Sequence, residues 1–393
     1  MVIREYSKVE LVFSSSESEA VKIALVNLRR DLIRTLDCSV TAGGIIRILV
    51  GTVGNLPELD KKADISKLQA EDGTYRKEAF LIQEKDGELL IAGTDRRGTI
   101  YGIYDFCEWL GVSPWYFFAD VPVRRRSEVV IENGYCKVDY PSVEYRGIFI
   151  NDEEELEHWV WRYMGETTIG VKTYEKIFEL LLRLKLNYIW PAMHVNSFNL
   201  KQENGALANR MGIVVGTSHC DMLMRSNNRE WKPWLANKGY TDVEYDFSIP
   251  GRNREILKEY WRESVEQNRD FEVSYTVGMR GIHDSGFETK SLEGLTGEKL
   301  LKAKIELLES VMAAQQEILS ETLDTEPMKT FVPYKEVLEL YDNGLKVPED
   351  LTLIWTNDNY GYVRRYPGEK EKARKSGNGI YYHNSYWAPP GAS

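Results

Sequence analysis

The sequence predicts an α/β protein of two domains: a small N-terminal α/β domain followed by a (β/α)8 barrel of the TIM type, truncated before its last strand. The length of 393 residues is enough for two domains that each bury their own core. From residue 145 onward, short apolar strands alternate with amphipathic helices, which is typical of parallel βα units. Seven such units without a segregated second sheet favour a barrel over a doubly wound sheet.

The predicted first domain covers residues 1–137. Two stretches, "AVKIALVNLRRDLIRTL" and "RGTIYGIYDFCEWLG", have the apolar spacing of helices, and a glycine closes the second. Two short β-rich runs, "IRILVGTVG" and "GELLIAGTD", end in glycine or a turn signal, and "SEVVIENGY" is predicted as the final strand. The stretch "CKVDYPSVEYRG" is expected to link the two domains.

The predicted barrel covers residues 145–393. Its strands are expected in "YRGIFIND", "LNYIWPAM", "GIVVGTSH", "EVSYTVGM", "MKTFVPY", "LTLIWTND" and "GIYYHNS". No eighth strand follows, because the chain stops in the loop-like "YYHNSYWAPPGAS". We therefore expect an N-terminal fragment of a longer protein, with an open barrel edge and little or no activity of its own.

Composition narrows the class of protein. The net charge is −11, so we expect no nucleic-acid partner and no binding to an anionic membrane. The four cysteines form no CxxC pair, which argues against a disulfide framework or a zinc site. The N-terminus lacks a signal peptide and no run is long enough to span a membrane. A cytoplasmic protein is expected, or a secreted one if a leader was removed.

Polar and ionisable residues follow all seven predicted strands. In a (β/α)8 barrel, the loops at the carboxyl ends of the strands build the active site. Polar residues at one or two strand ends would indicate helix capping, but seven converging ends indicate a polar pocket. These residues are Asn151, Asp152 and Glu153; His194 and Asn196; Ser218, His219 and Asp221; Arg280, His283 and Asp284; Tyr334, Lys335 and Glu336; Asn357, Asp358 and Asn359; and His383, Asn384 and Tyr386.

Six of these segments together resemble family 115 of the glycoside hydrolases, α-glucuronidases that remove (4-O-methyl)glucuronic acid side chains from xylan. The segments are "YRGIFINDEEEL", "LNYIWPAMH", "GIVVGTSHCDMLMR", "VGMRGIHDSGF", "YKEVLELYDNGLKVPEDLTLIWTNDNYGYVRR" and "GIYYHNSYW". The resemblance extends into the first domain through "AGTDRRGTIYGIYDFCEWLGVSPWYFFADVPV". It implies an N-terminal α/β domain and a (β/α)8 barrel, followed by further C-terminal regions that would lie beyond the last residue.

The resemblance also implies roles for residues at the strand ends. Asp284 and Glu336 match the essential carboxylates, and we expect them to be catalytic. Asp152 matches a third essential acid, Arg280 and Tyr386 match substrate-site positions, and Asn359 falls in the "NDN" loop that faces the same pocket. These four residues are expected to bind substrate. His219 is expected to join them by hydrogen bonding rather than to ligate a metal, because no HxH or HExxH spacing occurs. No metal and no cofactor are expected.

The expected mechanism uses two carboxyl groups. Family resemblance implies an inverting hydrolysis, with the groups about 6.5–9.5 Å apart so that a water fits between them. Glu336 is assigned as general acid, with a pKa raised by burial and neighbouring acids, and Asp284 as general base; the reverse assignment stays open. Arg280 is expected to bind the uronate carboxylate in bidentate fashion, the alternative being a salt bridge that only orients Asp284.

Two other functions stay open at this stage. One is a retaining, hexosaminidase-like glycosidase, which would need an adjacent acidic pair at one strand end, whereas "GIHDSGF" contains a single acid. The other is a non-catalytic carbohydrate-binding fragment. The expected partner is glucuronoxylan or a uronylated xylo-oligosaccharide. A homodimer is expected to form through C-terminal regions outside this sequence.

Overall fold

The computed structural model describes residues 1–151, 155–282, 285–358 and 360–384. The chain divides into two compact units. Unit one comprises residues 1–147, 172–188 and 207–213, and unit two comprises 148–171, 189–206 and 214–393. The predicted domain limits, 1–137 and 145–393, remain predictions. Each unit is a mixture of helices and strands, so the α/β class holds.

Unit one contains a six-stranded sheet with the order β3-β2-β4-β6-β5-β8. Strands β3, β2, β4 and β6 run parallel to one another, while β5 pairs antiparallel with both β6 and β8. Strand β8 overturns part of a prediction, because "CKVD" was expected to belong to a linker and instead forms the edge of this sheet. The bounds are Lys8–Val12 (β2), Ser39–Val40 (β3), Ile46–Thr52 (β4), Phe80–Lys85 (β5), Glu88–Gly93 (β6) and Cys136–Asp139 (β8).

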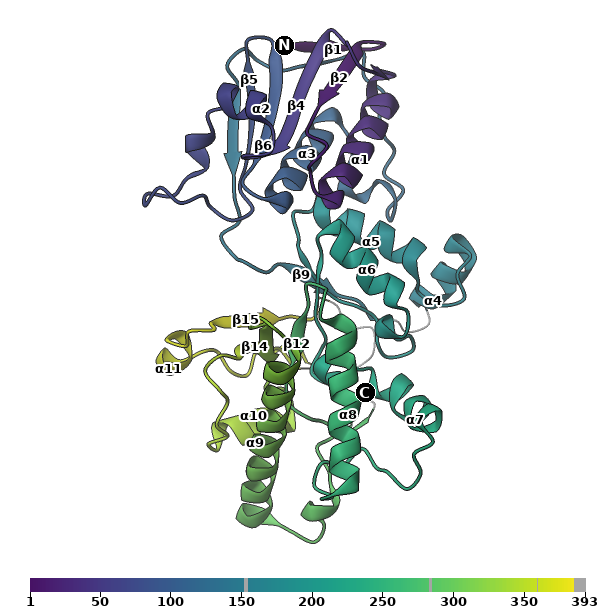
Figure 1. Ribbon diagram of the computed structural model, residues 1–393, viewed down its shortest axis with the longest axis vertical. Helices are drawn as coiled ribbons and strands as arrows, with labels where there is room; N and C mark the ends of the chain where they lie inside the picture. The colour runs from purple at the N-terminus through teal and green to yellow at the C-terminus, as the bar shows by residue number, and fades with distance from the viewer. Residues whose placement is uncertain (152–154, 283–284, 359, 385–393) are drawn as a thin grey trace. The chain divides into compact units, whose positions relative to one another are not determined.

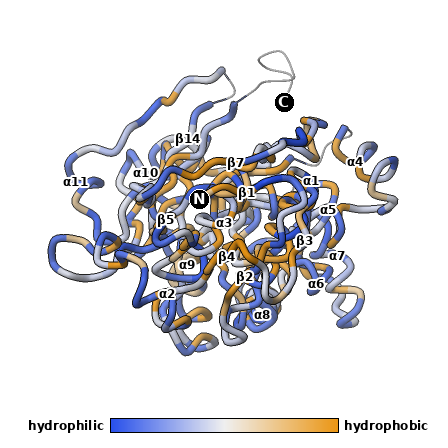
Figure 2. Tube along the Cα trace, turned by 90° about the horizontal axis from the view of Figure 1, so that it is seen from above, coloured by the Kyte–Doolittle hydropathy of each residue, from blue (hydrophilic) through white to orange (hydrophobic). Residues whose placement is uncertain are grey.

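Helices cover both faces of this sheet (Figure 1). Alternate residues along the strands face opposite sides: Leu49 and Leu90 pack with Leu59 of the short α2 (Pro57–Lys62). The other face is covered by α3 (Arg96–Leu110), which packs against α1 (Glu19–Leu36). Strands β2 and β4, which carry buried residues such as Val9 and Leu49, include hydrophobic segments in Figure 2.

Helix α3 was predicted from its apolar spacing, and its ends show why it forms here. The Asp95 side chain accepts a hydrogen bond from the backbone N–H of Gly98 and so caps the first turn. Gly111, with φ of 104°, closes the last turn in a left-handed conformation that favours glycine. Gly102 lets the helix approach the sheet closely, because a Cβ there would lie 2.8 Å from a methyl group of Ile91.

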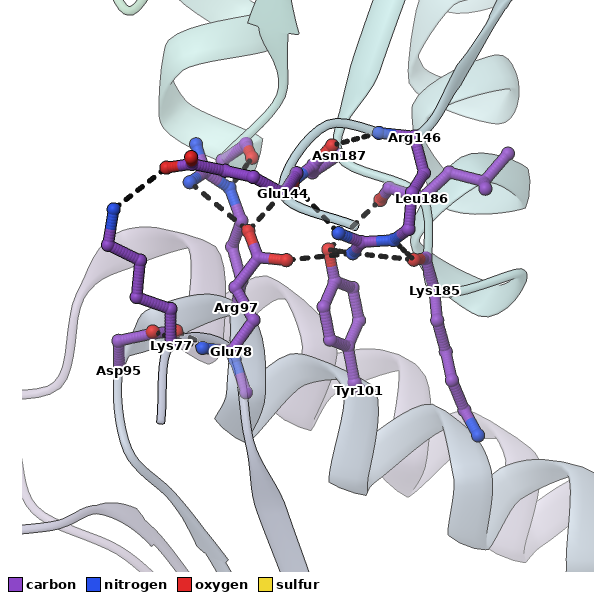
Figure 3. A network of polar contacts seen from close by, with 12 residues as sticks. Lys77, Glu78, Asp95, Arg97, Tyr101, Glu144, Arg146, Lys185, Leu186 and Asn187 are labelled. Atoms are coloured by element: carbon purple, nitrogen blue, oxygen red, sulfur yellow. Dashed lines mark hydrogen bonds and ion pairs between the residues drawn. The ribbon is translucent and has the colours of Figure 1, made fainter. Parts of the chain in front are cut away.

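A buried carboxylate ties three segments of unit one together (Figure 3). Glu78 accepts hydrogen bonds from Arg146 Nη2 at 2.7 Å and from Asn187 Nδ2 at 2.8 Å. Arg146 also donates to the backbone carbonyl of Lys185 and to the hydroxyl of Tyr101. The network joins the segment before β5, Arg146 near the end of the first stretch of unit one, and the turn that follows α5 (Val171–Arg183).

A second network in unit one buries two carboxylates around one arginine. Arg183, at the end of α5, donates to Asp31 at 2.7 Å and to Glu179 at 2.9 Å. Asp31 is fully buried and Glu179 is nearly so. Arg30 adds a second positive charge, with its Nη2 2.6 Å from Glu179 Oε1. Burial opposes ionisation of Glu179, but the arginines outweigh it and hold its pKa below the ordinary value.

We expect Arg183→Met to destabilise the protein by about 3–5 kcal/mol, because it leaves two carboxylates buried with reduced compensation. Chemical denaturation of the variant and the parent measures the difference. Arg29→Met is the matched control: Arg29 is exposed on α1, and its replacement is expected to change stability by less than about 0.5 kcal/mol. Equal stability of Arg183→Met and the parent would show that the network contributes nothing to folding.

The seven predicted strands of the second domain all form. They are Gly147–Phe149 (β9), Tyr188–Trp190 (β10), Val214–Val215 (β11), Ser274–Thr276 (β12), Met328–Phe331 (β13), Thr352–Thr356 (β14) and Asn378–Tyr381 (β15). One sheet has the order β11-β10-β9, and another has β12-β13-β14-β15, whose pairs are all parallel. A parallel bridge between Val215 and Val273 joins the two sheets, so the strands lie in sequence order.

Helices follow most of these strands, as predicted. The longest are α8 (Arg252–Asn268) and α9 (Gly297–Thr322), which pack on each other. The others are α4 (Glu155–Trp159), α6 (Gln202–Met211), α7 (Asn227–Lys238), α10 (Glu336–Asp342) and α11 (Glu369–Lys372). Unit one also contains a short antiparallel pair of strands, β1 (Val2–Arg4) and β7 (Glu128–Val130). Among the residues described, no helix is long and apolar enough to cross a membrane.

Candidate active site

Arg280 and Glu336 form the centre of the candidate site. Arg280 follows β12 and Glu336 follows β13, and these strands are parallel neighbours, so their carboxyl ends lie side by side. The guanidinium donates through Nε to Oε1 at 2.9 Å and through Nη2 to Oε2 at 3.0 Å. This is the two-pronged geometry in which arginine binds carboxylates best. The Arg280 side chain is 2% exposed, whereas that of Glu336 is 23% exposed and reaches the surface of the site.

The environment of Glu336 favours its ionised form. Burial disfavours the charge, but the hydrogen bonds and the charge of Arg280 outweigh burial and lower the pKa of Glu336 below its ordinary value. The backbone N–H of Phe287 also donates to Oε1, at 3.2 Å. A raised pKa was expected for a general acid at this position. The pKa of Glu336 is lowered instead, because the main charged neighbour among the residues described is the cation Arg280 and not a second acid.

Lys335 turns the chain between β13 and the helix that Glu336 begins. Its φ of 50° and ψ of −124° are a conformation that non-glycine residues adopt at a cost of about 1–3 kcal/mol. Burial and the charge of Arg280 lower the pKa of Lys335, while Glu336 raises it. Such strain persists only where the surrounding structure enforces it, which is frequent at functional sites.

His219 follows β11 and lies against the same residues. Its ring centroid is 4.4 Å from that of Tyr334, whose ring also faces Arg280. Burial, together with the charges of Arg280 and Lys335, lowers the pKa of His219 to about 3. The imidazole is therefore neutral at neutral pH and can both donate and accept hydrogen bonds, as a residue that binds sugar hydroxyls would.

We expect the His219 imidazole to stay neutral between pH 5 and pH 8, because its pKa of about 3 lies well below this range. The ring ¹⁵N chemical shifts, followed by NMR over that range, measure the protonation state directly. They should stay constant while those of free imidazole in the same tube change. A midpoint above pH 5.5 would show that His219 is not buried beside the positive charges of Arg280 and Lys335 as the structure has it.

His383, after β15, extends the site toward β14. Its backbone N–H and its Nδ1 both contact Asn357 Oδ1, at 3.0 and 3.1 Å. An amide oxygen only accepts, so Nδ1 carries the proton and Nε2 accepts from the Tyr381 hydroxyl, 2.9 Å away. Burial and the nearby His219 lower the pKa of His383.

Aromatic side chains from the first, second and seventh of these strands meet. Phe149 (β9), Trp190 (β10) and Tyr381 (β15) have ring centroids 5.1–5.7 Å apart, all in edge-to-face or nearly edge-to-face arrangements. Tyr381 also holds His383, so this cluster lies directly beside the polar residues. The first and the last strand of the series are thus in side-chain contact.

Three of the seven predicted site residues are described, and the structure brings them together. They are His219, Arg280 and Glu336, linked by the ion pair and by the charges that lower the pKa of His219. Asp152, Asp284, Asn359 and Tyr386 lie outside the described residues, so their predicted roles stay predictions. Among the residues described, no group of three His, Cys, Asp or Glu side chains could hold a metal ion.

Sequence reasoning missed part of the site. Lys335 and Tyr334 were recognised only as residues after a strand, and no role was assigned to them. Their position directly before the predicted catalytic Glu336 was the available signal. The Phe287 N–H was not foreseen, because no sequence pattern specifies which backbone amide faces a distant carboxylate.

Comparisons with known proteins show the family to which the chain belongs. Residues 138–393 match the family described as glycosyl hydrolase family 115. A solved structure of a family 115 4-O-methyl-α-glucuronidase, with specificity for decorated arabinogalactans, is 36% identical and has a TM-score of 0.87. The similarity covers 99% of this chain but 50% of that protein, so the chain spans half of its length. A search of curated proteins found no match.

More distant structures share the fold. An exo-β-N-acetylglucosaminidase from Vibrio harveyi is 13% identical with a TM-score of 0.52, over 92% of this chain and 55% of that one. A β-N-acetylhexosaminidase from Bacteroides fragilis is also 13% identical, with a TM-score of 0.50, over 91% of this chain and 67% of that one. At this identity the likeness concerns the fold alone.

Proposed function

This chain belongs to glycosyl hydrolase family 115, and from that premise we propose that it hydrolyses the bond joining an α-linked (4-O-methyl)glucuronic acid side chain to a polysaccharide. The observation that carries the proposal is the two-pronged pair of Arg280 and Glu336 at neighbouring strand ends. The guanidinium of Arg280, which binds one carboxylate at this position, can also attract the carboxylate of a uronic acid. Glu336 supplies one of the two carboxyl groups that glycoside hydrolysis needs.

The proposed mechanism inverts the anomeric carbon. Asp284 acts as general base on a water, and Glu336 acts as general acid on the leaving oxygen. In the structure, Arg280 lowers the pKa of Glu336, which suits a carboxylate and not an acid. When the substrate is bound, its uronate carboxylate also interacts with Arg280. This second negative charge near Glu336 disfavours the ionised form of Glu336 and raises its pKa. Protonation of Glu336 is then coupled to the arrival of the correct, charged sugar.

The proposed architecture around this site is a (β/α)8 barrel. Two features support it. The seven strands lie in sequence order, and the ring centroids of Phe149 in the first strand and Tyr381 in the seventh are 5.6 Å apart. A flat sheet would hold these two strands far apart, since neighbouring strands are about 4.8 Å apart. Polar residues at the carboxyl ends then face one pocket.

Xylan and arabinogalactan are the two candidate polysaccharides that would carry the (4-O-methyl)glucuronic acid side chain. The sequence motifs resemble those of xylan α-glucuronidases, whereas the similar solved enzyme has specificity for decorated arabinogalactans. The proposed substrate class is therefore the branch itself, α-linked (4-O-methyl)glucuronic acid. No metal or cofactor is needed, because two carboxyl groups and a water suffice.

The test is to incubate the protein with glucuronoxylan and, separately, with a glucuronic-acid-bearing arabinogalactan, and to quantify free (4-O-methyl)glucuronic acid by anion-exchange chromatography. We expect release from at least one of them. After the carboxylates of the same polymers have been reduced to alcohols, the branch is (4-O-methyl)glucose, and we expect no release of that sugar, because it carries no carboxylate for Arg280 to attract. Release of neutral sugars or N-acetylhexosamine without uronic acid would contradict the proposal.

A further inference from the structure

A buried glutamine holds the backbone of the strand that leads to Arg280. Gln315 lies in the interior of α9 and is fully buried. Its Oε1 accepts a hydrogen bond from the backbone N–H of Gly278 at 2.8 Å, and its Nε2 donates to the carbonyl of the same residue at 2.9 Å. The side-chain amide thus binds both polar groups of one residue, as a neighbouring strand would.

Gly278 is the residue at which the chain leaves the sheet. Strand β12 ends at Thr276, and the last bond to β13 is donated by the N–H of Val277 to Thr330, at 2.9 Å. Gly278 has φ of +131°, a conformation that L-residues rarely adopt, while the space around a Cβ would allow ordinary contacts. The backbone conformation, and not crowding, therefore requires glycine here. Without Gln315, two buried backbone groups would lose their partners.

The bend at Gly278 sets the direction of Arg280, two residues later. Met279 and Arg280 are both 2% exposed, so neither side chain can relax into solvent. The Arg280 guanidinium must meet two oxygens of Glu336 at once, and such a two-pronged geometry tolerates little error. A shift of about 1 Å in a catalytic group can cost about a hundredfold in rate.

We propose that Gln315 is a positioning residue: its amide fixes Gly278 so that Arg280 is held in register with Glu336 and with the substrate. That Gln315 affects catalysis rests on the function proposed above. That Gln315 fixes the position of Arg280 does not, since this concerns only Gly278, Arg280 and Glu336. Gln315 itself touches neither the substrate site nor Glu336 in the contacts described; it acts through the backbone.

The test compares Gln315→Met with Gln316→Met. Methionine keeps the unbranched side chain and removes both hydrogen bonds to Gly278. Gln316, the next residue of the same helix, contacts Asp350 and Lys329 instead, so its replacement is the matched control. We expect kcat of Gln315→Met to fall at least tenfold, with Gln316→Met within twofold of the parent.

The pH dependence gives a readout that general loss of stability would not produce. If Arg280 is no longer held on Glu336, the pKa of Glu336 rises, because Arg280 is what lowers it. The limb of the pH–rate profile that belongs to Glu336 should therefore move to higher pH in Gln315→Met, and stay in place in Gln316→Met.

Gln315→Glu provides a conditional rescue. A carboxylic acid both donates and accepts, so the introduced group restores both hydrogen bonds to Gly278 when protonated and only one when ionised. Activity relative to the parent should rise as the pH falls. A variant that behaves like Gln315→Met at every pH would contradict the role of the two hydrogen bonds.

A crystal structure of Gln315→Met separates this inference from the proposed function. We expect at least one of the two Arg280–Glu336 hydrogen bonds to be lost. If the parent releases no uronic acid but Arg280 is displaced in the variant, the proposed function fails and the positioning role stands. If both hydrogen bonds persist in the variant, or its kcat and pH profile equal those of the parent, the inference is wrong.

Discussion

Replacement of Glu336 by glutamine is expected to lower kcat for uronic acid release by about 10²–10⁴-fold. Glutamine keeps the shape of the side chain and still offers an oxygen to Arg280, but it can neither give up nor take up the proton that the leaving oxygen requires. Steady-state kinetics on a glucuronidated oligosaccharide measure the loss, and circular dichroism checks the fold. The resemblance assigns the second carboxyl group to Asp284, so Asp284→Ala is expected to cause a loss of the same order.

The control for this prediction is Glu339→Gln. Glu339 lies one turn further along α10 and is exposed, so its replacement removes an equal charge from the same helix without touching Arg280. Its kcat should stay within about twofold of the parent. An active Glu336→Gln variant would mean that the ion pair with Arg280 is structural and that other residues transfer the proton.

Replacement of Arg280 by lysine is expected to lower kcat/KM by about a hundredfold, although the charge is kept. Lysine cannot contact both Glu336 oxygens at once, and a side chain that is 2% exposed has little room to find another arrangement. With weaker pairing the pKa of Glu336 rises toward its ordinary value, so the corresponding limb of the pH–rate profile should move to higher pH.

Arg262→Lys is the matched control for Arg280→Lys. Arg262 lies on α8 and pairs at the surface with Glu321, where the side chains are 39% and 52% exposed. Exposed pairs of this kind contribute at most about 1 kcal/mol, so activity and pH profile should be unchanged. If Arg280→Lys matches the parent in both, the two-pronged contact between Arg280 and Glu336 has no role in catalysis.

The strands of the second domain could be predicted because their signal is local. Runs such as "LTLIWTND" combine β-branched and aromatic residues with a polar end, and the structure forms a strand within it, Thr352–Thr356. Strand lengths were less predictable: in "GIVVGTSH" only Val214–Val215 form a strand. Strand β8 was missed because the proline and polar residues after "CKVD" indicate a linker, whereas its place depends on pairing with β5, far away in sequence.

The partner of Arg280 could not be predicted from the sequence. The arginine and Glu336 are separated by 56 residues, and their meeting depends on the register of β12 against β13. Gln315 gave no signal either, since one polar residue on a helix normally faces solvent. The burial of Gln315 is explained only by its hydrogen bonds to Gly278, a residue that is distant in sequence. Local patterns thus predict which strand ends carry chemistry, and tertiary contacts decide which groups pair.

The central claim is that the Arg280–Glu336 site cleaves an α-linked glucuronic acid branch with inversion. The most direct test is ¹H NMR of the anomeric protons during the first minutes of hydrolysis of a glucuronidated oligosaccharide, before the released sugar equilibrates. The account predicts that free glucuronic acid appears first as the β-anomer, and that Glu336→Gln produces no signal on this timescale. First appearance of the α-anomer, or no release by the parent protein, would contradict it.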